Sequence, residues 1–251
     1  MSLSVIIITK NESAVIRRCL ESVAWAGEII VVDSGSSDDT VAICREFTGR
    51  IQVGDWPGFG LQKNRALDLA RGDWVLSIDA DEYLTPALRI EIEKTLSDPG
   101  ACPAYRLPRR SSYCGRFLRH GGWWPDYVVR LFRRGHARFS DDPVHERLLV
   151  DGATGTLHEP LLHEAFSDLE EVLDKIDRYS TAGASMLHAH GRRGSLGRAL
   201  GHGLWAFVRT YVLRAGFLDG REGFMLAVSN AEGTYYRYLK LMLLDRSPTR
   251  R

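Results

Sequence analysis

Short apolar runs alternate with amphipathic segments through the N-terminal part of the chain, and this alternation limits the possible folds more than any other feature. Four runs have strand-like composition: "LSVIIIT", "EIIVVD", "RIQVGDW" and "DWVLSID". Continuous apolar runs of this length are typical of strands that are buried on both faces of a sheet. Because helix-like segments separate the runs, the pattern predicts an α/β domain whose parallel sheet has helices on both faces.

Helix start and stop signals lie between these runs. Asn11 is a candidate N-cap for the first helix, and Gly72 is expected to close the helix that precedes "DWVLSID". Thr85 is a candidate N-cap that is followed by Pro86 at the first helical position.

Composition changes along the second half of the chain. Residues 101–165 are rich in Arg, aromatic residues, Gly and Pro, which predicts short strands and long loops. From Ser167 the pattern is helical, and "SDLE" reads as a capping box. We therefore predict an α/β domain over residues 1–165 and a helical C-terminal region over residues 166–251.

Polar clusters follow three of the predicted strands. They are Thr9–Glu12, Asp33–Ser37 and Asp79–Glu82. In open parallel sheets the carboxyl ends of the strands share one rim, and ligands bind there. Three polar clusters on one rim exceed what stability alone requires, so the rim is the predicted binding site.

The Asp79-Ala80-Asp81 stretch is the strongest local signal on this rim. Two carboxylates at a strand end offer oxygen ligands to Mg²⁺ or Mn²⁺, which can bridge a diphosphate. The alternative is a solvated turn that flanks a helix N-terminus, where acids are favoured. The neighbouring strand-end clusters favour the metal site, while Glu82 is expected to cap or orient the following segment.

Asp33 ends the second predicted strand. A carboxylate there can accept hydrogen bonds from a nucleobase or a ribose, as in nucleotide-binding α/β folds. Its alternative role is a helix cap, although Ser36, Ser37 or Asp38 could supply that cap. Neither GxxxxGK[ST] nor GxGxxG occurs, which argues against a P-loop or a dinucleotide-binding protein.

The charge is balanced overall but uneven along the chain. The net charge of 251 residues is +1, so no global field favours nucleic acid. Residues 101–150 nevertheless contain ten Arg against four acidic residues, and residues 192–251 contain eleven basic against four acidic ones. Basic segments on a neutral chain indicate local anionic partners: phosphates, acidic glycans or a lipid surface.

Features that report on location point to the cytoplasm. The four Cys residues form no CxxC pair and read as reduced thiols. The N-terminus lacks the basic region and the apolar length of a signal peptide. No apolar stretch of about 18 residues is present, so no transmembrane helix is predicted.

Two aromatic or basic features suggest contacts with a saccharide and a membrane. Trp123 and Trp124 lie in "HGGWWPDYVVRLFRR", where flat rings can stack on sugars and Arg130 can hold phosphate or carboxylate. The two Trp residues are equally compatible with core or lid positions. Basic residues also occur among apolar ones in the C-terminal helices, which suits either an anionic membrane surface or ordinary helix packing. They are Arg198, Arg209, Arg214, Arg221, Arg237 and Lys240.

Four stretches together resemble the family 2 glycosyltransferases, which have the GT-A fold. They are "SVIIITKNE", "EIIVVDSGSSDDT", "LQKNRALDLARGDWVLSIDADE" and "RLFRRGHARFSDDPVHE". The Arg-rich block and "RTYVLRAGFLDGREGF" extend the similarity to lipopolysaccharide core glucosyltransferases that modify inner-core heptose. The resemblance implies an inverting transferase that moves a sugar, first of all glucose from UDP-glucose, to a lipid-linked saccharide. It also implies a peripheral position on the inner face of the cytoplasmic membrane.

The resemblance implies roles for individual residues. Asp79 and Asp81 would hold the donor sugar and the metal. The nucleotide-binding residues would be Thr9, Asn11, Glu12 and Asp33, with Lys63 and Arg65 beside the nucleotide or its phosphates.

An inverting transfer needs a carboxylate to take the acceptor's proton. The resemblance implies that this base lies late in the α/β domain, where "SDDPVHE" offers Asp141, Asp142 and Glu146. Glu146 is the first candidate and Asp142 the second. Asp126 is a further base candidate and, with the two Trp residues and Arg130, an acceptor-site candidate. His145 is either a further metal ligand or an ordinary structural histidine.

Other functions fit parts of this pattern. A sugar-phosphate nucleotidylyltransferase also uses an α/β sheet, a metal and a nucleotide, but "TKNESAV" lacks the Gly-rich basic loop such an enzyme needs after its first strand. A transferase for another surface polysaccharide or glycoconjugate shares every motif above. A non-catalytic saccharide-binding or membrane-scaffold protein would tolerate loss of Asp79 and Asp81.

Overall fold

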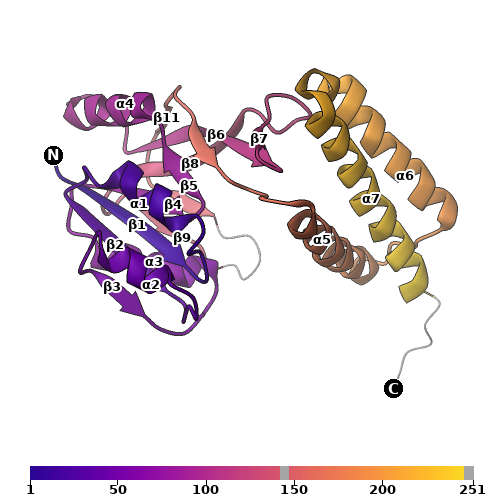
Figure 1. The fold of residues 1–251 in the computed structure, drawn as a ribbon, viewed down its shortest axis with the longest axis horizontal. Helices are drawn as coiled ribbons and strands as arrows, with labels where there is room; N and C mark the ends of the chain where they lie inside the picture. The colour runs from indigo at the N-terminus through magenta and orange to yellow at the C-terminus, as the bar shows by residue number, and fades with distance from the viewer. Residues whose placement is uncertain (142–146, 246–251) are drawn as a thin grey trace. The chain divides into compact units, whose positions relative to one another are not determined.

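The computed structural model describes residues 1–141 and 147–245 (Figure 1). Within it the chain forms two compact units. The first, here called the α/β unit, contains Met1–Arg109 and Asp126–Glu164. The second, here called the helical unit, contains Arg110–Pro125 and Ala165–Arg251. The predicted division at residue 165 differs from this grouping in residues 110–125.

The α/β unit is built on a parallel sheet, as the alternating pattern predicts. Four parallel strands lie in the order β3-β2-β1-β4. They are β1 (Leu3–Thr9), β2 (Glu28–Asp33), β3 (Ile51–Val53) and β4 (Trp74–Asp79). The helices between them are α1 (Ile16–Val23), α2 (Thr40–Arg45) and α3 (Phe59–Leu69), and α4 (Pro86–Ser97) follows. The predicted α/β class and the helical C-terminal region are confirmed.

The position of β1 inside the sheet explains why its sequence is apolar throughout. Val5 and Ile7 pack in one apolar cluster, while Ile6 and Ile8 pack in another. Successive side chains of a strand point to opposite faces, so both faces of the sheet are covered.

Antiparallel strands extend this sheet beyond β4, and here the expectation of short strands and long loops is only partly right. The order continues β4-β8-β6-β12-β5, with β8 antiparallel to both β4 and β6. The added strands are β5 (Glu82–Leu84), β6 (Ala104–Tyr113), β8 (Asp126–Arg133) and β12 (Leu161–His163). Smaller strands are β7 (Arg116–Phe117), β9 (Ala137–Phe139), β10 (Leu148–Val150) and β11 (Thr154–Thr156). The long strand β6 lies between β8 and β12, and it therefore joins these two segments in one sheet.

Helix boundaries were predicted at Asn11, Gly72, Thr85 and Ser167, and the one at Thr85 is confirmed. Thr85 caps α4, since its hydroxyl accepts the Leu88 N–H. Asn11 is not an N-cap, because α1 begins at Ile16. Gly72 lies beyond the end of α3 at Leu69, in contact with β1. At α5 the cap is Asp168 rather than Ser167, and Glu171 rather than Glu170 completes the box.

The helical unit consists of three long helices and the segment Arg110–Pro125. The helices are α5 (Leu169–Ala189), α6 (Leu196–Val208) and α7 (Gly220–Leu244), with a π-helical turn η1 (Arg209–Leu213) and a 3₁₀ turn η2 (Gly216–Asp219) after α6. Tyr113 and Leu118 share an apolar cluster with Val172 of α5 and Leu226 of α7. This packing is why residues 110–125 belong with the helices. Among the residues described, no helix is both long and apolar enough to cross a membrane.

Candidate functional site

The loops that follow β1 and β2 are tied together at the rim of the sheet. Asn11 has a left-handed backbone (φ 57°), which asparagine tolerates better than most residues. Its backbone N–H donates to Ser36 Oγ at 2.8 Å, and its side-chain oxygen accepts the Ser37 N–H at 2.8 Å. Glu12 N–H donates to Thr40 Oγ1, also at 2.8 Å. These bonds fix the two loops against each other and shape the rim.

Asp33 is completely buried at the end of β2 and organises the loop after it. One carboxylate oxygen accepts the N–H groups of Gly35 and Ser36, both at 2.9 Å, and the other accepts the Ser36 hydroxyl. Asp33 therefore forms the turn after β2. The alternative role, a helix cap, is wrong, because α2 begins at Thr40 and its N-cap is Asp39. Contact of Asp33 with a nucleotide stays a prediction.

Thr9 ends β1 with a polar atom that has no partner. Its side chain is buried, and its hydroxyl makes no hydrogen bond to any residue that the structure describes. A buried hydroxyl without a partner is unfavourable. Thr9 is therefore suited to bind a polar group of a ligand, as predicted for it.

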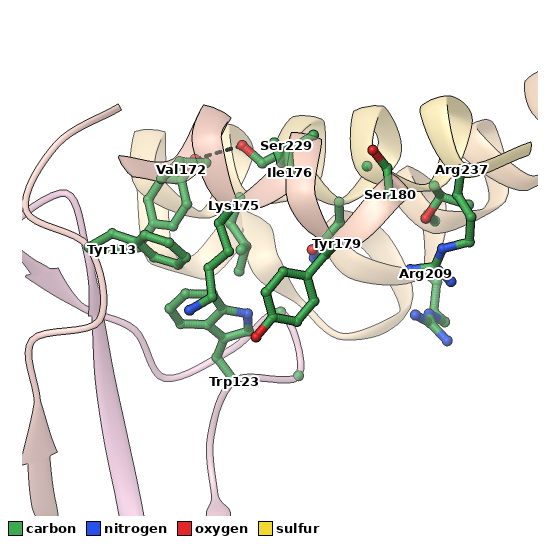
Figure 2. Close-up of a pocket in the computed structure, with 18 of the residues that line it drawn as sticks. Tyr113, Trp123, Val172, Lys175, Ile176, Tyr179, Ser180, Arg209, Ser229 and Arg237 are labelled. Carbon is green, nitrogen blue, oxygen red and sulfur yellow. Dashed lines mark hydrogen bonds between the residues drawn. The ribbon is translucent and has the colours of Figure 1, made fainter. Parts of the chain in front are cut away.

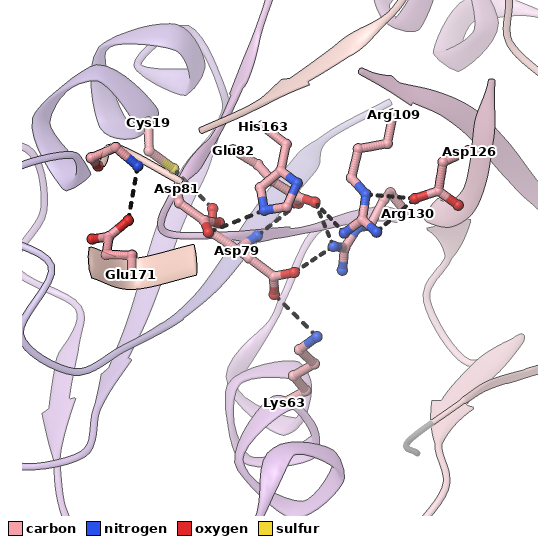
Figure 3. A network of polar contacts seen from close by, with 11 residues as sticks. Cys19, Lys63, Asp79, Asp81, Glu82, Arg109, Asp126, Arg130, His163 and Glu171 are labelled. Atoms are coloured by element: carbon pink, nitrogen blue, oxygen red, sulfur yellow. Dashed lines mark hydrogen bonds and ion pairs between the residues drawn. The ribbon is translucent and has the colours of Figure 1, made fainter. Parts of the chain in front are cut away.

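Asp79 at the end of β4 lies between two cations (Figure 3). Lys63 Nζ is 3.1 Å from one carboxylate oxygen, and Arg130 Nη2 is 2.5 Å from the other. Burial disfavours the charged carboxylate, but the charges and hydrogen bonds of Arg130 and Lys63 outweigh it and hold the pKa of Asp79 well below its usual range. Asp79 is therefore a fixed anion at neutral pH.

Glu82 is fully buried and joins this network from the other side (Figure 3). One of its oxygens accepts from Arg130 at 2.7 Å and from Arg109 at 3.4 Å, and the other accepts the Asp79 N–H at 2.9 Å. The expectation that Glu82 caps or orients the following segment is wrong, because it holds the preceding Asp79 and two arginines. Burial works against the charge of Arg130, but Asp79 and Glu82 raise the pKa of Arg130 above its ordinary value.

Asp126 is the outer end of the network. Arg109 donates to one Asp126 oxygen from Nε at 3.0 Å and from Nη2 at 2.6 Å. The chain of contacts Lys63–Asp79–Arg130–Glu82–Arg109–Asp126 lies entirely within the α/β unit. The structure thus joins predicted donor residues (Lys63 and Asp79) to predicted acceptor residues (Arg130 and Asp126).

Asp81 has a different partner, His163, which the sequence analysis missed. His163 Nε2 lies 3.2 Å from Asp81 Oδ2, and both side chains are partly exposed. The antiparallel pairing of β12 with β5 produces this contact, and the Glu164 N–H donates to the Asp81 carbonyl at 2.9 Å. Since the two residues are 82 positions apart, no local spacing signals the pair.

The donor atoms around Asp81 fit a divalent cation in part. A carboxylate oxygen and an imidazole nitrogen are ligands that Mn²⁺ accepts. Within residues 1–141 and 147–245 no group of three or more acidic, His or Cys residues could hold a metal. Asp79, the other predicted ligand, is instead engaged by its two cations. Protein ligands from the described residues would thus leave several positions for a diphosphate and water.

The remaining predicted residues are dispersed. Arg65 Nη1 binds Asp55 at 2.8 Å and Gln62 at 3.1 Å, so it does not join its neighbour Lys63 in the network. Trp123 packs with Tyr113 and Phe166 in the helical unit. Trp124 also belongs to that unit and is partly buried. The candidate bases Glu146 and Asp142 and the candidate ligand His145 lie outside the described residues.

Comparison with known proteins identifies the family of this chain. Residues 4–146 match Glycosyl transferase family 2. The lipopolysaccharide core biosynthesis glycosyltransferase LpsC of Rhizobium meliloti (strain 1021) is 31% identical over 92% of this chain and 88% of its own length. The uncharacterized glycosyltransferase RP128 of Rickettsia prowazekii (strain Madrid E) is 31% identical over 95% of this chain and 86% of its own.

Among solved structures, S. aureus TarS 1-349 in complex with UDP-GlcNAc aligns with a TM-score of 0.49 and 14% identity, over 100% of this chain and 93% of that one. The family match includes β1, β2 and β4, and therefore the three polar clusters of the rim. Since that match covers more than half of the chain, and the LpsC relative extends it through the helices, this protein belongs to glycosyl transferase family 2.

Proposed function

We propose that this glycosyltransferase moves a sugar from a nucleoside diphosphate sugar to a lipid-linked saccharide, with inversion at the anomeric carbon. The observation that carries the proposal is the arrangement at the end of β4. There Asp79 is held as an anion between Lys63 and Arg130, while the neighbouring Asp81 is paired with His163. UDP-glucose is the proposed donor.

Asp81 and His163 are the residues that would hold a divalent cation, with the donor diphosphate as a further ligand. When bound, Mg²⁺ or Mn²⁺ neutralises the charge that develops on the departing diphosphate. Asp79 has a separate task in this proposal. Because Lys63 and Arg130 fix its carboxylate and Glu82 accepts its backbone N–H, Asp79 can accept hydrogen bonds from donor sugar hydroxyls without reorganisation.

The attacking hydroxyl of the acceptor must lose its proton to a carboxylate. We propose Glu146 for this step, with Asp142 as the second candidate. Asp126 is less suited, because one of its oxygens already accepts two hydrogen bonds from Arg109.

The acceptor proposal is an inner-core lipopolysaccharide heptose. It rests on the similarity to LpsC, which is described as a lipopolysaccharide core biosynthesis glycosyltransferase. The alternative acceptor is another surface polysaccharide or glycoconjugate. Trp123, Trp124 and Arg130 stay candidates for acceptor contacts.

A lipid-linked acceptor lies at a membrane surface, and helix α6 has a face that suits one. Leu196, Leu200 and Leu204 are each more than half exposed, and their spacing of four places them on the same side. Exposed Arg193 and Arg198 lie on or just before the same helix. Apolar and basic groups together favour an anionic leaflet. Sedimentation with phosphatidylglycerol vesicles should therefore be weakened in Leu200→Glu, and equal sedimentation of both proteins would contradict this part of the proposal.

The donor site is tested by calorimetry with UDP and UDP-glucose, each with and without Mn²⁺. We expect Mn²⁺-dependent binding that is lost in Asp81→Asn and weakened in His163→Gln. Asp68→Asn is the matched control, because Asp68 is an exposed carboxylate that pairs with Arg138 on the surface. Absence of nucleotide binding, or binding that is indifferent to Mn²⁺ and to Asp81, would refute the proposal and favour a non-catalytic saccharide-binding protein.

A further inference from the structure

The helical unit contains a cavity of about 420 Å³ that no step above uses (Figure 2). Its walls come from helices α5 and α7, from the end of α6 with the turn that follows, and from the segment containing Tyr113 and Trp123. All of its lining residues belong to the helical unit. This volume is within the range of small-molecule sites.

The cavity is strongly cationic. Among the residues that the structure describes, four basic side chains and no Asp or Glu line it. They are Lys175, Arg209, Arg214 and Arg237. Positive charges that share one concave site repel each other, and the site therefore attracts anions. Guanidinium groups bind phosphate with paired, charge-assisted hydrogen bonds.

Two of the arginines occupy space that is free only because the neighbouring residues are glycines. The guanidinium of Arg214 lies where a Cβ on Gly122 would be, and Arg237 Nε lies 2.7 Å from the Cβ position of Gly183. Side chains at these two positions would displace the arginines. Arg237 Nε is also buried without a hydrogen-bond partner among the described residues. An unsatisfied buried donor is unfavourable by itself and is available to a ligand.

Arg209 begins the π-helical turn Arg209–Leu213. Such turns are rare and often occur at functional sites. The next residue, Thr210, is buried and accepts a hydrogen bond from Asn230 of α7 at 3.2 Å. This bond fixes the π turn against α7 and with it the start of the Arg209 side chain.

The remaining walls are suited to a sugar ring. Trp123, Tyr113 and Tyr179 contribute aromatic surface, and Figure 2 shows their rings among the labelled lining residues. Aromatic rings pack well against the apolar faces of pyranoses. Hydroxyl and amide groups for hydrogen bonds come from Ser180, Ser229, Asn230 and Thr234.

We propose that this cavity binds a phosphate-bearing saccharide. The guanidinium groups hold the phosphate, and the aromatic wall contacts the sugar ring. Binding in this cavity involves residues of the helical unit alone. That the bound saccharide is the acceptor of the transfer rests on the proposed function. In that reading the enzyme selects phosphorylated acceptors in the helical unit and carries out the transfer at the rim of the sheet.

The full-length protein is titrated with mannose 6-phosphate, mannose and inorganic phosphate, followed by ligand-observed NMR and calorimetry. Mannose 6-phosphate should bind more tightly than either of the other two. Arg237→Gln and Arg209→Gln should each weaken its binding about tenfold or more, since each removes charge-assisted hydrogen bonds. Arg192→Gln should change nothing, because Arg192 is exposed and outside the lining. Circular dichroism verifies folding, and Arg209→Lys, which keeps the charge, should lose less than Arg209→Gln.

Three outcomes would overturn the inference. Equal affinity for phosphate and mannose 6-phosphate would make the cavity a simple anion site. Loss of phosphatidylglycerol vesicle binding in Arg237→Gln, without mannose 6-phosphate binding by the wild type, would make it a lipid headgroup site. Unchanged mannose 6-phosphate binding in both Gln variants would place the ligand elsewhere.

UDP binding with Mn²⁺ is measured on the same samples. UDP binding without sugar phosphate binding refutes only this inference, whereas the reverse result refutes only the proposed donor site.

Discussion

Replacing Arg130 with Met tests whether the buried network at the end of β4 stabilises the α/β unit. Arg130 is buried, and its Nη2 bonds both to Asp79 at 2.5 Å and to Glu82 at 2.7 Å. Met matches the aliphatic part of Arg but lacks the guanidinium group. The substitution would therefore keep the packing of the side-chain stem, remove the charge, and leave Glu82 buried with Arg109, at 3.4 Å, as its remaining side-chain partner among the described residues.

The expected loss is large because a buried charge keeps most of its desolvation penalty when its partner is removed. Breaking a buried ion pair in this way costs about 3–5 kcal/mol. Arg138 provides a matched control, since it also pairs with an aspartate, Asp68, but both side chains are mostly exposed. Exposed pairs contribute about 0–1 kcal/mol, so Arg138→Met should change little.

Hydrogen exchange of the β4 amides is the appropriate assay, because it reports the opening free energy of this strand rather than of the whole chain. Protection of the Leu76 and Ile78 amides should fall by about 3–5 kcal/mol in Arg130→Met and by less than about 1 kcal/mol in Arg138→Met. Equal protection in the two variants would mean that the network is no more stabilising than a surface pair, and the reasoning above would be wrong.

Three further predictions concern pH, packing and thiol chemistry. The pKa of Asp79 is depressed in the folded chain, so its stabilising effect is complete above its unfolded pKa near 3.8 and is lost as the pH falls below that value. The urea concentration at the unfolding midpoint should therefore drop from about pH 5 downward, and it should drop less steeply in Asp79→Asn. Gly72→Ala should lower stability by about 1–3 kcal/mol in thermal unfolding, because the new Cβ would lie 2.8 Å from the Ser4 backbone nitrogen; an unchanged midpoint would contradict this. Burial raises the pKa of the Cys44 thiol to about 11, so iodoacetamide at pH 8 should leave it unmodified until the protein is denatured.

The parts of the fold that follow local rules could be predicted from the sequence. Strand–helix alternation fixes a parallel order and brings the ends of β1, β2 and β4 to one rim, which is why Thr9, Asn11 and Asp79 could be selected together. The conformation of each loop was harder to predict. Asn11 looked like a helix cap, but its amide binds Ser37 across the rim, in a loop whose position depends on β2.

The partners of the rim carboxylates could not be predicted, because antiparallel pairings between distant segments supply them. Arg130 reaches Asp79 because β8 runs against β4, with Leu131 opposite Leu76. His163 reaches Asp81 because β12 runs against β5. The sequence pattern of the strands does not specify which edge strand pairs with which, and so Glu82 was assigned to a cap instead of a buried network.

The cationic cavity was missed for a different reason. The C-terminal arginines were projected onto regular helices, where they formed a basic surface or the wet side of a helix. The structure separates them. Lys240 pairs with Asp177 and Arg221 pairs with Glu222, whereas Arg209, Arg214 and Arg237 line the cavity. A π turn adds a residue to the helix and rotates the side chains after it by about 100° relative to an α-helical projection. A period of 3.6 therefore assigns Arg214, which follows the turn, to the wrong face, and a binding site that depends on such a turn cannot be recognised from periodicity.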